Sequence, residues 1–123
     1  MTYLAISVGA VLGANARYLV GGWIAERIGT GFPYGTLVIN VSGSFLIGIV
    51  LTVVGERALA PWWVRPMLAI GFLGSYTTFS TFSFETLALV ESGSLVAAAA
   101  NVLGSVGAAL LGVYLGTALA RIL

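Results

Sequence analysis

Four long apolar runs dominate this chain of 123 residues and leave little room for other structure. They cover about residues 4–25, 34–55, 64–90 and 95–119, and short connections with charged residues or helix breakers separate them. An α-helix needs about 20 consecutive apolar residues to cross a bilayer, and each run reaches that length. The sequence therefore predicts an all-α integral membrane protein with four transmembrane helices, in a single domain over 1–123, with both termini on the same side.

Composition narrows the possible functions. Charged residues make up only 7% of the chain, whereas a soluble domain carries about a quarter. The net charge of +1 argues against binding to nucleic acid, which needs a concentrated basic surface. The chain has no histidine, cysteine or lysine, so imidazole and thiolate chemistry and Schiff bases are excluded. Because no nucleophile–base pair or metal cluster remains, we do not expect an enzyme.

The third apolar run is unusual because residues 71–86 combine hydroxyl groups, aromatic rings and a carboxylate. Polar groups and irregular backbone are costly in hydrocarbon unless protein or a water-filled cavity lines them. Gly74 and Ser75, followed by two β-branched threonines, predict a break of this helix near residues 74–79. The segment therefore indicates a path across the membrane for a small ion or molecule.

A broken helix offers binding groups at both half-helix ends. The carbonyls that end its first half can coordinate a cation, and the amides that start its second half point toward an anion. Beyond the break, Phe79 and Phe82 are three residues apart and share a helical face, where their electropositive ring edges could meet an anion. Ser80, Thr81 and Ser83 add hydroxyl donors beside them. The alternative is that both phenylalanines are ordinary packing residues.

Other polar residues in the apolar runs allow structural as well as functional interpretations. Asn40 shares a face of the second run with Thr36 and Ser44, at four-residue spacing. Its amide could donate to a permeating species or make a hydrogen bond between helices. Arg17 and Glu85 also lie inside apolar runs, where a charge costs about 3 kcal/mol on insertion scales. Each either belongs to a transport route or serves as an interfacial anchor or ion-pair partner.

Small residues recur at four-residue spacing, as at Gly9 and Gly13 in the first run and Gly112 and Gly116 in the fourth. Such stripes let helix backbones approach closely in lipid, either within one bundle or between subunits. Four helices alone pack with little space for a pore, so the stripes suggest an oligomer.

The distribution of arginines gives only a small orientation bias. The side that holds the termini would carry Arg57, Arg65 and Arg121, and the other side Arg27. Three against one is little for the positive-inside rule to act on. Insertion in both orientations is therefore compatible with the sequence.

Three segments closely resemble the signature of the Fluc (CrcB-like) fluoride channels, and with the four-helix layout the resemblance covers essentially the whole chain. The fourth helix matches only loosely, through Asn101 and its glycines. The segments are Gly74-Ser75-Tyr76-Thr77-Thr78-Phe79-Ser80-Thr81-Phe82-Ser83, Gly13-Ala14-Asn15-Ala16-Arg17-Tyr18 and Asn40-Val41-Ser42-Gly43-Ser44-Phe45.

The resemblance implies a channel that exports fluoride passively across the membrane and so protects the cell from fluoride toxicity. It implies an antiparallel, dual-topology homodimer with two separate pores, in the plasma membrane of a prokaryote (the inner membrane of a Gram-negative cell). The implied partners are a second copy of the chain, fluoride and membrane lipid.

The resemblance also implies roles for individual residues. The backbone carbonyls of Gly74 and Thr77 map to those that hold a structural sodium ion at the dimer interface. Ser75 and Tyr76 differ from the Gly-Phe often found there. The fluoride pore would be lined by residues of the second and third helices, namely Asn40, Phe79, Phe82, Ser80, Thr81, Ser83 and Glu85.

Two other classes of membrane protein compete with this interpretation. A small multidrug-resistance type proton-coupled exporter has a similar size, but it requires a carboxylate in the middle of its first helix. Here the first run contains Asn15 and Arg17 and no acid in that place. A non-transporting assembly subunit would explain the glycine stripes, but it would not explain the run of hydroxyls and rings in the third helix.

Overall fold

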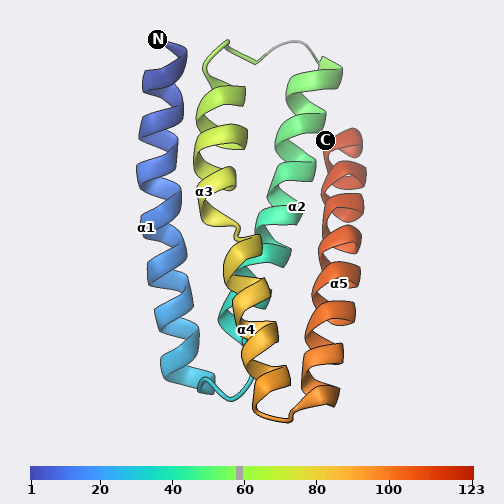
Figure 1. Ribbon diagram of the computed structural model, residues 1–123. Coiled ribbons are helices and arrows are strands. Elements are labelled where there is room, and N and C mark those ends of the chain that lie inside the picture. The colour runs from blue at the N-terminus through green and yellow to red at the C-terminus, as the bar shows by residue number, and fades with distance from the viewer. Residues whose placement is uncertain (58–59) are drawn as a thin grey trace.

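The computed structural model describes residues 1–57 and 60–123, and this part of the chain contains helices and short connections without strands. The all-α prediction is confirmed. Both termini lie toward the same end of the bundle (Figure 1). The helical elements are α1 (Thr2–Ile28), α2 (Tyr34–Arg57), the π-helix η1 (Arg65–Leu73), α3 (Gly74–Tyr76), α4 (Phe79–Glu91) and α5 (Leu95–Ile122).

Three helices, α1, α2 and α5, are long and apolar enough to cross a membrane. The third predicted run is divided among η1, α3 and α4, which follow one another along the middle of the molecule (Figure 1). Gly74 and Ser75, where the sequence suggests that the break begins, are helical. The extended backbone lies at Thr77 and Thr78, because a threonine side chain caps the following helix there, whereas glycine alone does not end a helix.

Two glycines make the turns at one end of the bundle. Gly29 follows α1 with φ 91°, and Gly93 lies between α4 and α5 with φ 80°. Both conformations are costly for a residue with a Cβ atom. The observed turns lie at 29–33 and 92–94, so α1 and α4 continue through the first residues of the predicted connections 26–33 and 91–93. The predicted connection at 56–61 includes residues 58 and 59, which lie outside the described residues.

The glycine stripes pack within the single chain. A Cβ atom at Gly9 would overlap the carbonyl oxygen of Met67, and one at Gly13 would overlap that of Phe72. Helix α1 therefore lies directly against the backbone of η1. On the other side of the bundle, Gly116 of α5 lies equally close to the carbonyl of Phe45 in α2. Packing within the chain therefore accounts for Gly9, Gly13 and Gly116, whereas nothing lies within 4 Å of a Cβ atom at Gly104 of the same α5 stripe.

A small apolar core holds α2 against the end of α3. It consists of Ile39, Leu73 and Tyr76, each at most 7% exposed. Phe72 stacks on the Tyr76 ring with the centroids 5.9 Å apart. The Tyr76 hydroxyl is 3.0 Å from Ser42 Oγ. This core fixes the last turn before the extended residues.

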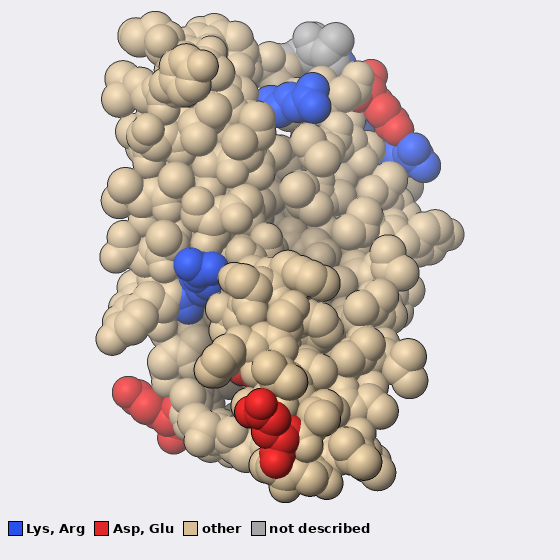
Figure 2. Space-filling view, viewed as in Figure 1, with Lys and Arg blue, Asp and Glu red and all other residues tan. Residues whose placement is uncertain are grey.

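On the face shown in Figure 2, charged groups lie mainly toward the two ends of the molecule, and a single basic side chain interrupts the uncharged surface between them. At one end, Arg121 of α5 and Glu56 of α2 form an ion pair at 2.7 Å. Beside it, Arg57 Nη2 donates to the carbonyl of Ala120 at 3.0 Å. These contacts join the carboxyl ends of α2 and α5, in the polar region expected outside the hydrocarbon.

The glycine packing predicts how single methyl groups affect stability. Gly9→Ala and Gly116→Ala each force two backbones apart, and we expect a loss of about 1–3 kcal/mol in the free energy of unfolding, as for other overpacked cores. Gly104→Ala is the matched control, because nothing lies within 4 Å of a Cβ atom there. The midpoint of thermal unfolding in detergent measures the difference. Equal midpoints for all three variants would contradict the close intrachain packing.

Candidate functional site

The site is built around two extended residues, Thr77 and Thr78, which separate α3 from α4. Thr77 has φ −78° and ψ 156°, and Thr78 has φ −150° and ψ 117°. The Thr77 amide and hydroxyl both donate to the Leu73 carbonyl, at 3.0 and 2.9 Å, which closes the preceding turn. Thr78 Oγ1 accepts from the Thr81 amide at 3.2 Å and so caps the start of α4, as threonine often does at a helix N-terminus.

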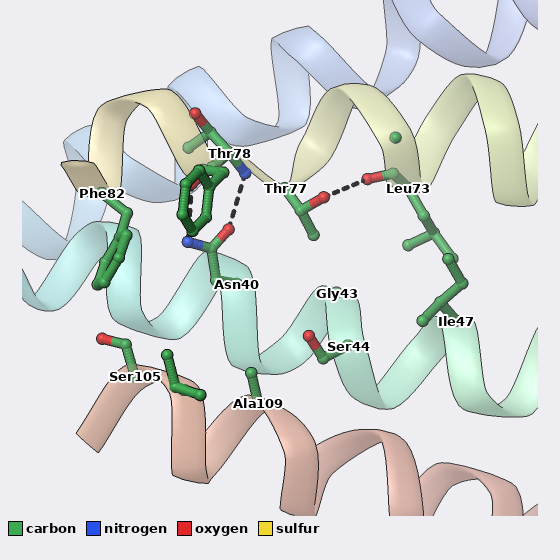
Figure 3. A pocket seen from close by; sticks show the side chains of 13 residues that line it. Asn40, Gly43, Ser44, Ile47, Leu73, Thr77, Thr78, Phe82, Ser105 and Ala109 are labelled. Carbon is green, nitrogen blue, oxygen red and sulfur yellow. Dashed lines mark hydrogen bonds between the residues drawn. The ribbon is translucent and has the colours of Figure 1, made fainter. Parts of the chain in front are cut away.

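Asn40 of α2 holds Thr78 from the opposite side. Its Nδ2 donates to the Thr78 carbonyl at 2.9 Å, and its Oδ1 accepts from the Thr78 amide at 2.7 Å (Figure 3). The interhelical hydrogen bond that the sequence left open for Asn40 is thus present, in a doubled form. Asn40 also remains in the wall of a cavity.

A cavity of about 330 Å³ lies beside these residues, between α2, the interrupted segment and α5 (Figure 3). It brings together five of the predicted site residues, and none of its lining residues carries a charge. A small ion there would meet amide, hydroxyl and carbonyl groups and the aromatic rings of Phe79 and Phe82. The lining residues are Asn40, Gly43, Ser44, Ile47, Leu73, Gly74, Thr77, Thr78, Phe79, Phe82, Ser105, Val106 and Ala109.

The two predicted rings differ in their surroundings. Phe79 and Phe82 contact each other with centroids 5.5 Å apart and planes tilted by 41°, as their three-residue spacing predicts. Phe82 is only 8% exposed, whereas Phe79 is 77% exposed. One ring therefore belongs to the wall of the cavity, and the other stands at its rim on the surface of the single chain.

A second, larger cleft of about 1080 Å³ lies between α1, α2, α4 and the connection 29–33. Glu85, Thr81 and Arg17 are among the residues that line it. Thr36 donates to Glu85 Oε1 at 2.6 Å, so the carboxylate is held by a hydroxyl of the second helix. Thr78 lines the cleft as well as the cavity.

Ser80 and Ser83 lie apart from both of these spaces. They are exposed on α4, and Ser83 Oγ donates to the Phe79 carbonyl of its own helix at 2.9 Å. Ser80 Oγ is 3.3 Å from Thr78 Oγ1. The structure of the single chain therefore brings together only part of the predicted set of pore residues.

A chain of hydrogen bonds joins α5 to the backbone of Phe82 in α4, and sequence reasoning missed most of it. Ser105 in the cavity wall donates to Asn101 Oδ1 at 3.1 Å, and Asn101 Nδ2 donates to Thr86 Oγ1 at 2.9 Å. Thr86 Oγ1 in turn donates to the Phe82 carbonyl at 2.7 Å. Asn101 is 2% exposed. An amide inside an otherwise apolar run is the signal that could have pointed to it.

Clustered acidic or imidazole ligands play no part in this site. Within residues 1–57 and 60–123 there is no group of three or more His, Cys, Asp or Glu side chains that could hold a metal ion. The ion pair Glu56–Arg121 lies at the helix ends, apart from the residues that line the cavity.

Comparison with known proteins gives consistent matches over the whole chain. Residues 4–117 match the family model described as CrcB-like protein, Camphor Resistance (CrcB). A protein of Roseiflexus sp. (strain RS-1) named fluoride-specific ion channel FluC is 50% identical over 123 residues, covering 100% of this chain and 99% of that protein. One of the same name from Geobacter metallireducens is 49% identical over 121 residues, covering 98% of each chain.

Proposed function

The chain belongs to the CrcB-like protein family, and from this membership and the geometry of the cavity we propose that it is a fluoride-specific ion channel. It is a multi-pass membrane protein of prokaryotic type. Fluoride would leave the cell passively through it, which protects the cell from fluoride toxicity. The observation that carries the proposal is a cavity of neutral donors and ring edges beside extended backbone, with no charged lining residue.

The cavity suits an anion that must lose water without being trapped. Fluoride is small and tightly hydrated, so its pathway has to offer many weak donors in place of one fixed charge. Ring edges at Phe79 and Phe82 carry the positive part of the aromatic quadrupole, and Asn40 and the hydroxyl groups add N–H and O–H donors. Selectivity over chloride would follow from the small width of such a pore.

Residues outside the cavity would extend this route. Thr78 lines both the cavity and the cleft that holds Thr81 and Glu85, so in this proposal the route passes Thr78 from one space to the other. Ser80 and Ser83 are exposed on α4 and would line a pore once another surface covers them. In this proposal η1, α3 and α4 together form the third, interrupted, transmembrane helix.

A second copy of the chain would complete the pathway. Phe79 is 77% exposed, and a ring on an open surface cannot enclose an ion from all sides. We therefore propose an antiparallel homodimer of dual topology with two pores, in which the partner covers this surface. The small arginine bias between the two ends supports insertion in both orientations.

A structural sodium ion fits the oxygen atoms left at the interruption. In a continuous helix the Gly74 carbonyl would accept from the Thr78 amide, and the Thr77 carbonyl from the Thr81 amide. The Thr78 amide donates to Asn40 Oδ1 and the Thr81 amide to Thr78 Oγ1 instead. Unwound carbonyls of this kind coordinate sodium in membrane proteins. Bound there, the ion would neutralise carbonyl dipoles and stabilise the interruption at the dimer interface.

The ring edges give a direct test of conduction. Phe79→Ile or Phe82→Ile keeps much of the bulk but removes a quadrupole contact of about 1 kcal/mol, so we expect fluoride efflux to fall about fivefold or more. Phe→Tyr at either position should be tolerated better. A fluoride electrode on reconstituted vesicles measures the rate, and vesicles loaded with chloride or nitrate test selectivity. Wild-type efflux in both Ile variants would show that the rings only pack.

Dual topology can be tested by chemical labelling, because the chain has no cysteine. A single cysteine at Thr30 or at Ser92, both in connections, should react with a membrane-impermeant maleimide from both sides of the membrane. The expected result is partial labelling from outside and completion after the membrane is opened. Labelling from one side alone at both positions would rule out an antiparallel pair.

The cation site predicts a contrast between two substitutions at one position. Thr77→Ala keeps the carbonyl and should be mild, costing about 1 kcal/mol for the hydroxyl bond to Leu73. Thr77→Pro should be severe, because it removes the amide that bonds Leu73 and disfavours the helical Tyr76 before it. Thermal unfolding in sodium and in choline salts gives the readout. A sodium-specific stabilisation that survives in Thr77→Pro would argue against carbonyl ligation.

A further inference from the structure

The contact between Asn40 and Thr78 has the form of a backbone pair. A primary amide presents one carbonyl and one N–H edge, as a peptide group does, and Asn40 uses both edges on the same residue, at 2.7 and 2.9 Å. Thr78 is extended, with φ −150° and ψ 117°. The Asn40 side chain therefore bonds Thr78 in the way that a neighbouring β-strand would.

These two hydrogen bonds give partners to the buried backbone amide and carbonyl of Thr78, which the interruption would otherwise leave unpaired. Thr78 is only 7% exposed, and a buried backbone group without a partner is costly, above all in a membrane. Without the Asn40 oxygen, the nearest helical partner for the Thr78 amide would be the Gly74 carbonyl. Forming that bond would extend α3 through Thr77 and consume a carbonyl that the proposed cation site needs.

The position of the pair adds a second consequence. Thr78 lines both the cavity with the two rings and the cleft with Glu85, and its hydroxyl bonds the amide and hydroxyl of Thr81 at 3.2 and 3.1 Å. Thr78 thus lies between the two spaces, and its conformation shapes the wall of each. Asn40 is the side chain of α2 that holds this residue by both backbone groups (Figure 3).

We infer that Asn40 is a positioning residue that acts through Thr78. It keeps the interruption extended and leaves the Gly74 carbonyl available for a cation. This inference rests on the proposed channel function, but it assigns to Asn40 the positioning of Thr78 in addition to donation to an anion. One Nδ2 hydrogen and the Oδ1 atom serve Thr78, and only the second Nδ2 hydrogen is left to meet an anion.

Two substitutions separate the two halves of the contact. Asn40→Ala removes both bonds to Thr78. Asn40→Asp keeps an oxygen that can accept from the Thr78 amide, but its carboxylate has no hydrogen for the Thr78 carbonyl. Asn15→Ala is the matched control, because Asn15 is exposed on α1 and its amide bonds only the Val11 carbonyl of its own helix, at 2.7 Å.

Hydrogen exchange of the Thr78 amide, followed by NMR on the full chain in detergent micelles, tests the contact directly. We expect exchange about tenfold faster in Asn40→Ala, the effect of losing one buried hydrogen bond. Exchange in Asn40→Asp and Asn15→Ala should stay within about twofold of the wild type. Unchanged Thr78 exchange in Asn40→Ala would overturn the inference, since a residue that only donates to the anion leaves this amide untouched.

A second measurement keeps the inference testable if Asn40→Ala folds poorly, and it separates positioning from general stability. The shift in unfolding midpoint between sodium and choline salts should be lost in Asn40→Ala, reduced in Asn40→Asp and retained in Asn15→Ala. A general loss of stability would lower the midpoints equally in both salts, and that result would overturn the inference.

Fluoride efflux from wild-type vesicles is measured in parallel and tests the channel proposal by itself. Absent efflux together with faster Thr78 exchange in Asn40→Ala would refute the channel and leave the contact in place.

Discussion

The absence of water inside a bilayer is the constraint on which this structure depends, because every backbone polar group must then find a partner within the protein. A continuous helix satisfies this constraint with its own backbone hydrogen bonds. The chain departs from helical geometry at Thr77 and Thr78. There the amides of Thr78 and Thr81 donate to the side chains of Asn40 and Thr78 in place of helical carbonyls. Among the described residues, no buried side-chain nitrogen or oxygen atom lacks a hydrogen-bond partner.

The surrounding packing stabilises the extended backbone at Thr77 and Thr78. Glycines bring α1 against η1 and α5 against α2 at backbone contact, so the helices on either side of the cavity are closely spaced. The core at Tyr76 fixes the turn before the extended residues, and the chain from Asn101 through Thr86 holds the turn after them. The polar residues can therefore bond to protein and still face a cavity.

The sequence predicted the parts of this arrangement that depend on local chemistry. The places of α1, α2 and α5 follow from the apolar runs, to within a few residues at their ends. The contact between Phe79 and Phe82 follows from helical spacing. The extended residues Thr77 and Thr78 lie inside the predicted break at 74–79, although Gly74 and Ser75 at its start are helical because the N-cap of the following helix is Thr78. The partner of Asn40 and the split between cavity and cleft depend on tertiary packing, and a single sequence contains no signal for them.

The exposed Phe79 ring has a consequence for biogenesis. In water an exposed phenylalanine promotes aggregation. In a bilayer the acyl chains are as apolar as a protein interior, so the inserted chain can leave the Phe79 ring exposed without a free-energy penalty. Since the polar groups at the interruption are already bonded within one chain, folding does not have to wait for a second subunit. For the proposed homodimer, assembly would then follow mass action in the plane of the membrane, and the number of dimers would rise faster than the number of inserted chains.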